Sequence, residues 1–430
     1  MTTTPAPGRR RNHVIDVARA ASVAVVVIFH GLLYQVRIVD GAPAIIPWAA
    51  PTYLYPLTWV LMIMPLFFVA GGFGHALTLD RMTREGASLG HFLASRGRRL
   101  VGPLLVFVGF CTFEASAAAW AGHVDAAVTL SRQLMQLLWF VSVYLVIIAV
   151  APLMVRLHDR HGALPMAVLL AGAVVVDAWS FSVGSDFGRN LNMLLVWPFV
   201  HQLGIAYERG WFRRGPLWTP WLALAGGAGA TAALVFGAGY PPTSVGFADL
   251  PIANIQPPTL AMATLALAQC GLLGLVERSG VLAHLTPRVE RNLAVANALM
   301  VTTYLWHIFC IGLAGLALVG LVYLWPAASG VLLNQLVVAA CGLATVVALV
   351  PLIGRLEFRL IPPLGAQQDT RTAVAAFALL MAGTTGVWLS GTVLHPAAPA
   401  SVLALASLFG GAWLMRRAAD TRRRPGPVAE

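Results

Sequence analysis

Arg19 and His30 stand eleven residues apart in the first apolar segment of the chain, DVARAASVAVVVIFHGLLY. Because a helix turns about 100° per residue, eleven steps complete about three turns and return both side chains to one face. Their Cα atoms then lie ~16 Å apart along the axis. Arginine binds phosphate, and imidazole exchanges protons near neutral pH. Since ionisable groups in hydrocarbon are costly, they mark functional positions. The pair predicts a reaction inside a membrane, with Arg19 near one surface and His30 near mid-depth.

A second group of arginines lies in HFLASRGRRLVGPLL, where Arg96 and Arg99 are one helical turn apart. This segment is expected to start at the membrane surface where Arg19 emerges. Three guanidinium groups converging there fit a polyanion through planar, bidentate contacts. The phosphates of a nucleotide-bearing donor such as coenzyme A are the natural ligand. The alternative interpretation is that these arginines only fix the membrane topology.

Later in the chain, Tyr304 and His307 are three residues apart in TTYLWH. They share a helix face and can line a pocket together. His75, at the end of the second apolar segment, is interpreted as an interfacial residue, and His201 as a packing residue. Taken singly, each of these positions is also compatible with ordinary helix packing.

The composition sets the solvent in which these residues work. Of 430 residues, 58% are hydrophobic and 10% are charged, and the mean hydropathy is +0.77. A soluble domain carries roughly 25% charged residues, so the chain is predicted to be a polytopic membrane protein. The net charge of +11 comes from arginines scattered through short loops, which indicates topology control and not nucleic-acid binding. The cysteines show no metal-ligand spacing, so no metal and no permanently bound cofactor are expected.

A membrane-spanning helix needs about 20 apolar residues. We therefore expect an all-α, polytopic transmembrane helical bundle of about 12 spans. Most arginines fall on one side of this arrangement, and Arg37, Arg132 and Arg189 fall on the other, which predicts two cytoplasmic termini in a multi-pass protein of the plasma membrane. The apolar segments lie near 14–34, 57–77, 100–121, 134–155, 164–183, 191–208, 218–238, 259–277, 297–323, 329–354, 372–391 and 398–415.

Two long, proline-rich outer loops are expected at 35–56 and 240–258. The second is polar enough to line a substrate entrance, and a purely structural cap is the alternative. The chain is expected to divide into a basic cytoplasmic arm at 1–13, a membrane domain at 14–365, two additional C-terminal spans at 366–415 and a basic cytoplasmic tail at 416–430.

Five motifs occur in a fixed order: Arg-x10-His in the first span, Gly-Gly-Phe at 71–73, Arg-x-x-Arg before the third span, Leu-Trp-Phe around Trp139, and Tyr-Leu-Trp-His ending at His307. This ordered set resembles the acyltransferase-3 family of integral-membrane O-acyltransferases over roughly residues 12–312. The resemblance implies that His30 is catalytic and that Arg19, Arg96 and Arg99 serve the acyl donor.

The chain departs from this family in two respects. Family members often have Ser-Gly-Phe where this chain has Gly-Gly-Phe at 71–73, so any role of the serine hydroxyl is missing here. Family members also commonly have about ten spans. The spans at 372–391 and 398–415 are therefore interpreted as additions to a 10-span core.

The expected function is transfer of an acyl group from acyl-CoA, as co-substrate, to a hydroxyl of a glycan, glycolipid or secondary metabolite. His30 acts as general base, and Tyr304 or His307 binds the oxyanion or the acceptor. An acyl-His30 intermediate is left open. The alternative is a transporter or flippase of an amphiphilic metabolite or lipid-linked sugar. Against it, the two halves of the chain show no similarity, and the charged residues concentrate in the first three spans.

Overall fold

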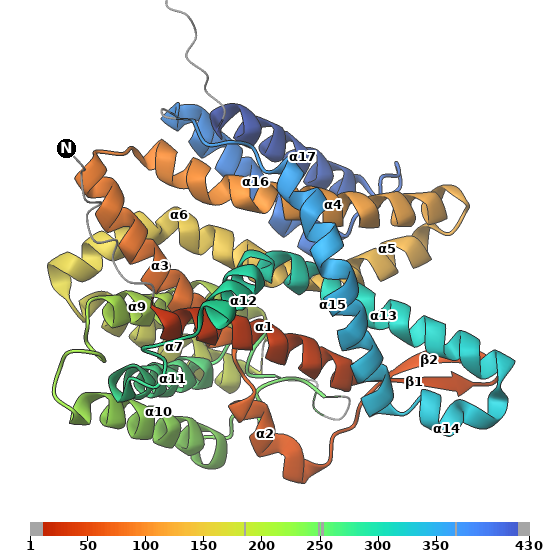
Figure 1. The fold of residues 1–430 in the computed structure, drawn as a ribbon, viewed down its shortest axis with the longest axis horizontal. Helices are drawn as coiled ribbons and strands as arrows, with labels where there is room; N and C mark the ends of the chain where they lie inside the picture. The colour runs from red at the N-terminus through yellow and green to blue at the C-terminus, as the bar shows by residue number, and fades with distance from the viewer. Residues whose placement is uncertain (1–11, 185, 248–249, 251–252, 366–367, 420–430) are drawn as a thin grey trace, which may run out of the picture.

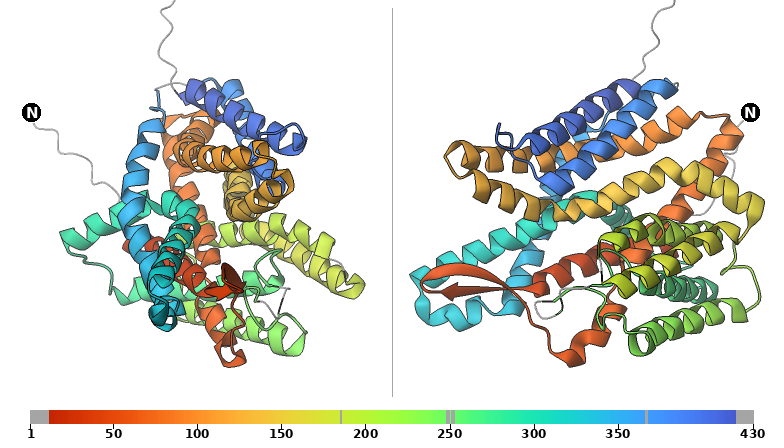
Figure 2. Two further views of the ribbon diagram at one scale, coloured as in Figure 1. Left: turned by 90° about the vertical axis from the view of Figure 1, so that its right-hand side faces the viewer. Right: turned by 180° about the vertical axis from the view of Figure 1, so that it is seen from behind.

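The computed structural model describes residues 12–184, 186–247, 250, 253–365 and 368–419. It is a bundle of long helices with one β-hairpin at one end (Figures 1 and 2). The hairpin consists of β1 Tyr34–Val39 and β2 Ala42–Pro47, and four short 3-10 turns are η1 Thr52–Leu54, η2 Met135–Leu137, η3 Asn190–Leu194 and η4 Pro326–Ala328. The α-helices are α1 His13–Leu33, α2 Tyr55–Val60, α3 Met64–Glu85, α4 Leu89–Trp120, α5 Val124–Leu134, α6 Leu138–His161, α7 Leu164–Val183, α8 Asp186–Arg189, α9 Val196–Glu208, α10 Trp218–Gly237, α11 Leu260–Ser279, α12 Pro287–Ala298, α13 Met300–Leu324, α14 Ser329–Leu332, α15 Gln335–Leu360, α16 Thr370–Ser390 and α17 Pro399–Ala419.

Eleven helices of the described chain are long and apolar enough to cross a membrane, which confirms the expected polytopic α-helical bundle. They are α1, α3, α4, α6, α7, α10, α11, α13, α15, α16 and α17. The twelfth expected segment, near 191–208, is divided between η3 and α9. With 13 residues α9 is ~20 Å long, shorter than the ~30 Å hydrocarbon core. All of α9 is buried, so its apolar sequence reflects a position inside the protein.

The start of α1 and the end of α17 lie at the same end of the bundle, which we call the inner end. Asn12, before α1, lines one cavity with Arg84 near the end of α3. Arg209, just after α9, forms ion pairs with aspartates near the ends of α3 and α6. Arg98, near the start of α4, donates a hydrogen bond to the carbonyl of Pro362, in the segment between α15 and α16. In the same segment, the Gly365 N–H donates to the carbonyl of Ala419, the last residue of α17. That the inner end faces the cytoplasm stays a prediction from the arginine distribution.

The basic arm expected at 1–13 and the basic tail expected at 416–430 are described only in part. Residues 1–11 of the basic arm and 420–430 of the basic tail lie outside the described residues. Residues 416–419, which the sequence assigned to the tail, form the last turn of α17, and the division itself stays a prediction.

Close helix contacts at glycines hold the centre together. A Cβ atom at Gly72 of α3 would collide with the backbone carbonyl of His201 in α9, and one at Gly204 of α9 would collide with that of Val69. Gly72 and Gly204 therefore allow α3 and α9 to approach backbone to backbone. Gly74 faces open space. On another side α3 packs against α1, which also contacts α13 and α15.

The two C-terminal helices form a hairpin along one side of the bundle (Figures 1 and 2). Gly383 of α16 and Gly411 of α17 each lie against the backbone of the other helix. Both helices pack against α4, where Gly97 leaves room for Met415. The hairpin thus supports the helix that carries Arg96.

The β-hairpin continues α1 at the end opposite the inner end, which we call the outer end (Figure 1). Its turn, Asp40–Gly41, has φ angles of 52° and 79°. Two positive φ angles match the right-handed twist of a two-residue hairpin, which explains the Asp-Gly sequence. The outer segment expected as a loop at 35–56 therefore contains regular structure.

Candidate active site

The first helix presents Arg19 and His30 to the interior of the bundle. Its start is fixed because the Asn12 side chain accepts a hydrogen bond from the Ile15 N–H and donates one, 3.0 Å long, to Glu277 in α11. Arg19 lines two cavities and His30 lines a third. Both residues of the sequence-derived stripe thus face cavities in the protein.

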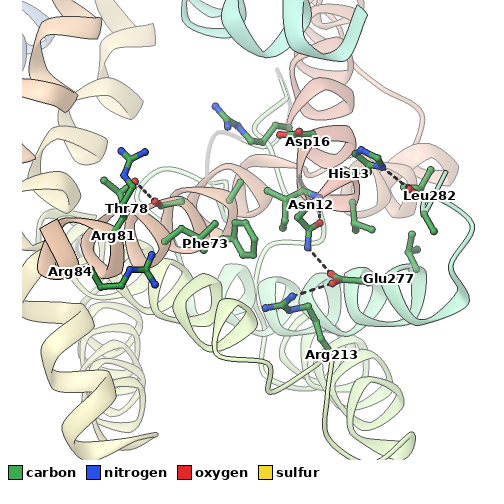
Figure 3. A pocket seen from close by; sticks show the side chains of 18 residues that line it. Asn12, His13, Asp16, Phe73, Thr78, Arg81, Arg84, Arg213, Glu277 and Leu282 are labelled. Carbon is green, nitrogen blue, oxygen red and sulfur yellow. Dashed lines mark hydrogen bonds and ion pairs between the residues drawn. The ribbon is translucent and has the colours of Figure 1, made fainter. Parts of the chain in front are cut away.

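The cavity at the inner end lies between α1, α3 and α11 and has a volume of about 650 Å³ (Figure 3). Glu277 in its wall forms an ion pair with Arg213, at 3.2 Å, so part of the positive charge is compensated. We call this the inner cavity. The arginines that line it are Arg19, Arg81, Arg84 and Arg213. Such a concentration of arginine favours a polyanionic ligand.

Sequence reasoning found Arg19 but missed the other arginines of the inner cavity. Arg81 and Arg84 repeat the Arg-x-x-Arg spacing at the end of α3, and this repetition is a signal that was present in the sequence. Arg213 follows α9, whose path the sequence did not reveal, so no sequence pattern pointed to it.

A narrower middle cavity of about 90 Å³ follows the inner one. Arg19 and Arg96 both contribute to its lining. Arg96 donates hydrogen bonds to the carbonyl of Gly74 and the hydroxyl of Thr78, and its Nε is buried without a partner among the described residues. The structure therefore brings Arg19 and Arg96 together at one cavity.

Arg99 lies in a different position from Arg96, the other arginine of the Arg-x-x-Arg motif. It is exposed and is not among the residues that line the inner or the middle cavity. The positive charges of Arg99, Arg19 and Arg81 nevertheless all act on Arg96. Arg99 thus contributes to the local field without contacting the cavity.

His30 and His307 meet at the centre of the bundle, with ring centroids 4.8 Å apart and ring planes at 67°. The Nδ1 atom of His30 lies 2.9 Å from the carbonyl of Val26, and that of His307 lies 2.7 Å from the carbonyl of Tyr304. A carbonyl only accepts, so each Nδ1 carries the hydrogen and each neutral ring keeps its lone pair on Nε2. The Nε2 atom of His307 is buried without a partner among the described residues. This arrangement brings together two rings that each carry a proton-accepting nitrogen.

Tyr304 stands between two cavities. Its ring lines both the middle cavity and an outer cavity of about 200 Å³, which also contains His30. Its hydroxyl donates a 2.8 Å hydrogen bond to the carbonyl of Leu137, so its proton is engaged while its oxygen can still accept. The structure thus places His30, Tyr304 and His307 in one cluster.

The outer segment expected at 240–258 lines the outer cavity through Val245, Gly246, Ile255 and Gln256. That this segment forms a substrate entrance stays a prediction. Most of the remaining lining is apolar and comes from α1, from the segment between α2 and α3, from Met64 at the start of α3, and from Leu137 and Trp139.

Asp177 holds this loop in place. Its carboxylate accepts hydrogen bonds from the Asn192 side chain at 2.7 Å, from the Tyr240 hydroxyl at 2.9 Å and from the Leu260 N–H at 2.7 Å. Because Tyr240 and Leu260 flank the loop, one buried carboxylate ties both of its ends to α7. We read this residue as structural.

The three cavities form a series from the inner end to the outer loop. The inner and middle cavities share Arg19, Ala70 and Gly74, and the middle and outer cavities share Tyr304. The shared residues place the three cavities one after another along α1, from Arg19 to His30. The helix rise between Arg19 and His30 is ~16 Å.

Comparison with known proteins agrees with this architecture. A family model described as an acyltransferase domain matches residues 12–355, most of the chain, and the match ends within α15, before α16 and α17. No curated protein and no solved structure matches the chain. The helical bundle and the matched domain together show that the chain belongs to the acyltransferase-3 family and is a multi-pass membrane acyltransferase.

Proposed function

We propose that the protein transfers an acyl group from acyl-CoA to a hydroxyl group of a glycan, glycolipid or secondary metabolite in the plasma membrane. The observation that carries this proposal is the series of cavities that leads from the inner arginines to the His30–His307 pair. A donor with an anionic head and a long, thin arm fits this shape.

The inner cavity suits the nucleotide of the donor. Phosphate groups form charge-assisted hydrogen bonds with guanidinium groups, and Arg19, Arg81 and Arg84 line a volume of about 650 Å³. Arg96 then meets the beginning of the pantetheine arm, and Arg99 adds positive charge from outside the cavity. The arm is comparable in length to the ~16 Å helix rise between Arg19 and His30, which carries the thioester to the catalytic cluster.

His30 acts as the general base in this proposal. Its Nε2 removes the proton from the acceptor hydroxyl while the hydroxyl oxygen attacks the thioester carbonyl. The tetrahedral intermediate collapses, the carbon–sulfur bond breaks, and the proton passes from His30 to the departing thiolate. The reaction forms one ester and one thiol from one thioester and one alcohol.

The neighbouring groups position the acceptor. The single proton of the reacting hydroxyl goes to His30, so Nε2 of neutral His307 and the Tyr304 oxygen, which are both acceptors, suit other O–H or N–H donors of the acceptor molecule and not an oxyanion. Tyr304 lines both the middle and the outer cavity. We favour direct transfer because it brings the thioester and the hydroxyl together where these two cavities adjoin. The alternative is an acyl-His30 intermediate.

Comparative mass spectrometry of glycans, lipids and metabolites tests the reaction. Cells that express the protein should contain a product heavier by one acyl group, and cells that express His30→Ala at equal abundance should lack it. Redistribution of an unmodified compound across the membrane would instead indicate the transporter alternative and would overturn the proposal.

A further inference from the structure

A second pair of histidines lies in the core and has no part in the proposed chemistry. The Nδ1 atom of His75 in α3 lies 3.0 Å from the Nε2 atom of His201 in α9. Both side chains are almost completely buried, with relative exposures of 1% and 0%. Sequence reasoning interpreted His75 as interfacial and His201 as packing, so this hydrogen-bonded pair was not expected.

The surrounding residues hold His75 in a fixed orientation. Its ring stacks on Tyr144 with centroids 5.8 Å apart and meets the edge of Phe92 at the same distance. The contact of Gly72 with the backbone of His201 keeps α9 close to α3. His201 is therefore a positioning residue, which engages Nδ1 of His75 and fixes the direction of the ring.

One ring nitrogen of His75 has no hydrogen-bond partner in the described part of the chain. His75 lines this cavity, its Nδ1 is engaged by His201, and its Nε2 is buried without a partner among the described residues. The Nε of Arg96, which lines the same cavity, is likewise buried and unpartnered. Buried polar atoms of native proteins nearly always have hydrogen-bond partners. Two such atoms at one cavity therefore indicate a polar ligand.

The size and the position of the middle cavity restrict this ligand. Its volume of about 90 Å³ is far below the 650 Å³ of the inner cavity, so it admits a thin chain and not a nucleotide. It shares Arg19 with the inner cavity and Tyr304 with the outer cavity that contains His30 in its lining. It therefore lies between the inner arginines and the catalytic cluster.

We infer that the middle cavity binds a secondary amide of the donor's pantetheine arm, with Arg96 Nε donating to the amide oxygen and His75 Nε2 bonding the amide as well. A secondary amide offers both an acceptor and a donor, so it suits His75 in either tautomer. This inference rests on the proposed function, because it assigns the arm of the proposed acyl-CoA donor to a specific station between Arg19 and His30.

Binding of two ligands to the purified full-length protein in lipid nanodiscs tests the assignment by calorimetry. Coenzyme A carries the pantetheine arm, whereas adenosine 3′,5′-bisphosphate has the phosphates and lacks the arm. His75→Phe keeps the ring shape and removes both nitrogens. It should weaken coenzyme A binding about tenfold, which is the loss expected for one buried hydrogen bond. It should leave bisphosphate binding unchanged. His75→Gln, which keeps a hydrogen-bonding group, should restore part of the affinity.

The outcomes separate this inference from the proposed function. Unchanged bisphosphate binding also shows that the His75→Phe protein is folded. If coenzyme A binds equally well to the wild-type and His75→Phe proteins, the amide station is refuted while the donor proposal stands. If neither ligand binds the wild-type protein, the donor proposal itself fails. An equal loss of both ligands in His75→Phe would show that His75 acts on the fold and would also overturn the inference.

Discussion

Arg19 and Arg99 are expected to differ sharply in their contribution to donor binding, although sequence reasoning treated them alike. Arg19 lines the inner and middle cavities, whereas Arg99 is exposed and lines neither. A hydrogen bond to a charged group contributes about 1.5–3 kcal/mol. Arg19 is partly exposed, so the lower end applies, and Arg19→Ala should weaken coenzyme A binding roughly 10–30-fold. An exposed charge contributes about 0–1 kcal/mol, so Arg99→Ala should cost at most about fivefold.

Calorimetry in nanodiscs at two salt concentrations measures both variants against the wild-type protein. The Arg99→Ala loss should shrink further at high salt, because it arises from screened long-range attraction. Thermal unfolding of each variant controls for folding. If Arg99→Ala weakens coenzyme A binding as much as Arg19→Ala does, the cavity assignment is refuted, because the exposed Arg99 side chain would then have to contact the donor.

Three further predictions concern the framework. Gly72→Ala should destabilise the protein by at least about 1–3 kcal/mol because its methyl group meets the α9 backbone, whereas Gly74→Ala, in open space, should be tolerated; equal thermal unfolding of the two variants would contradict this. Arg209→Ala should lower stability by about 1–2 kcal/mol because two aspartates lose a bidentate partner, and Arg209→Lys should recover only part of it in denaturant unfolding. Asp369 accepts hydrogen bonds from Thr372 and from the Arg371 N–H at the start of α16, and these hold the pKa of its carboxyl below the ordinary value. The carboxylate therefore stabilises the fold at neutral pH, and this stabilisation is lost as pH falls below about 4. Asp369→Asn should flatten the acid dependence of the unfolding free energy, and an unchanged pH profile would contradict this.

The sequence predicted the architecture well where hydropathy decides it. Eleven of the twelve expected segments are helices long enough to span, and the stripe from Arg19 to His30 faces cavities because helical periodicity places both residues on one side. The prediction of a membrane span near 191–208 was wrong, because a helix buried in a bundle is as apolar as one that crosses a membrane. Length was the better criterion, and η3 breaks that segment before α9 begins.

The candidate site was predictable along one helix and not between helices. Arg19, Arg96 and His30 line the series of cavities and His307 contacts His30, yet the exposure of Arg99 depends on how α4 packs. The His75–His201 pair joins residues 126 positions apart, a contact that no local pattern encodes. Tertiary packing, and not residue type, decides which of several intramembrane histidines meet.

The rate of acyl transfer by His30→Ala tests the central claim most directly. Membranes with equal amounts of folded wild-type, His30→Ala and His123→Ala protein are compared with acyl-CoA and the acceptor identified by mass spectrometry, and His123 serves as the exposed control. Removing a general base should slow transfer about 10²–10⁴-fold, and His123→Ala should retain the wild-type rate. A near-normal rate for His30→Ala would contradict the proposal that this imidazole takes the proton from the acceptor hydroxyl.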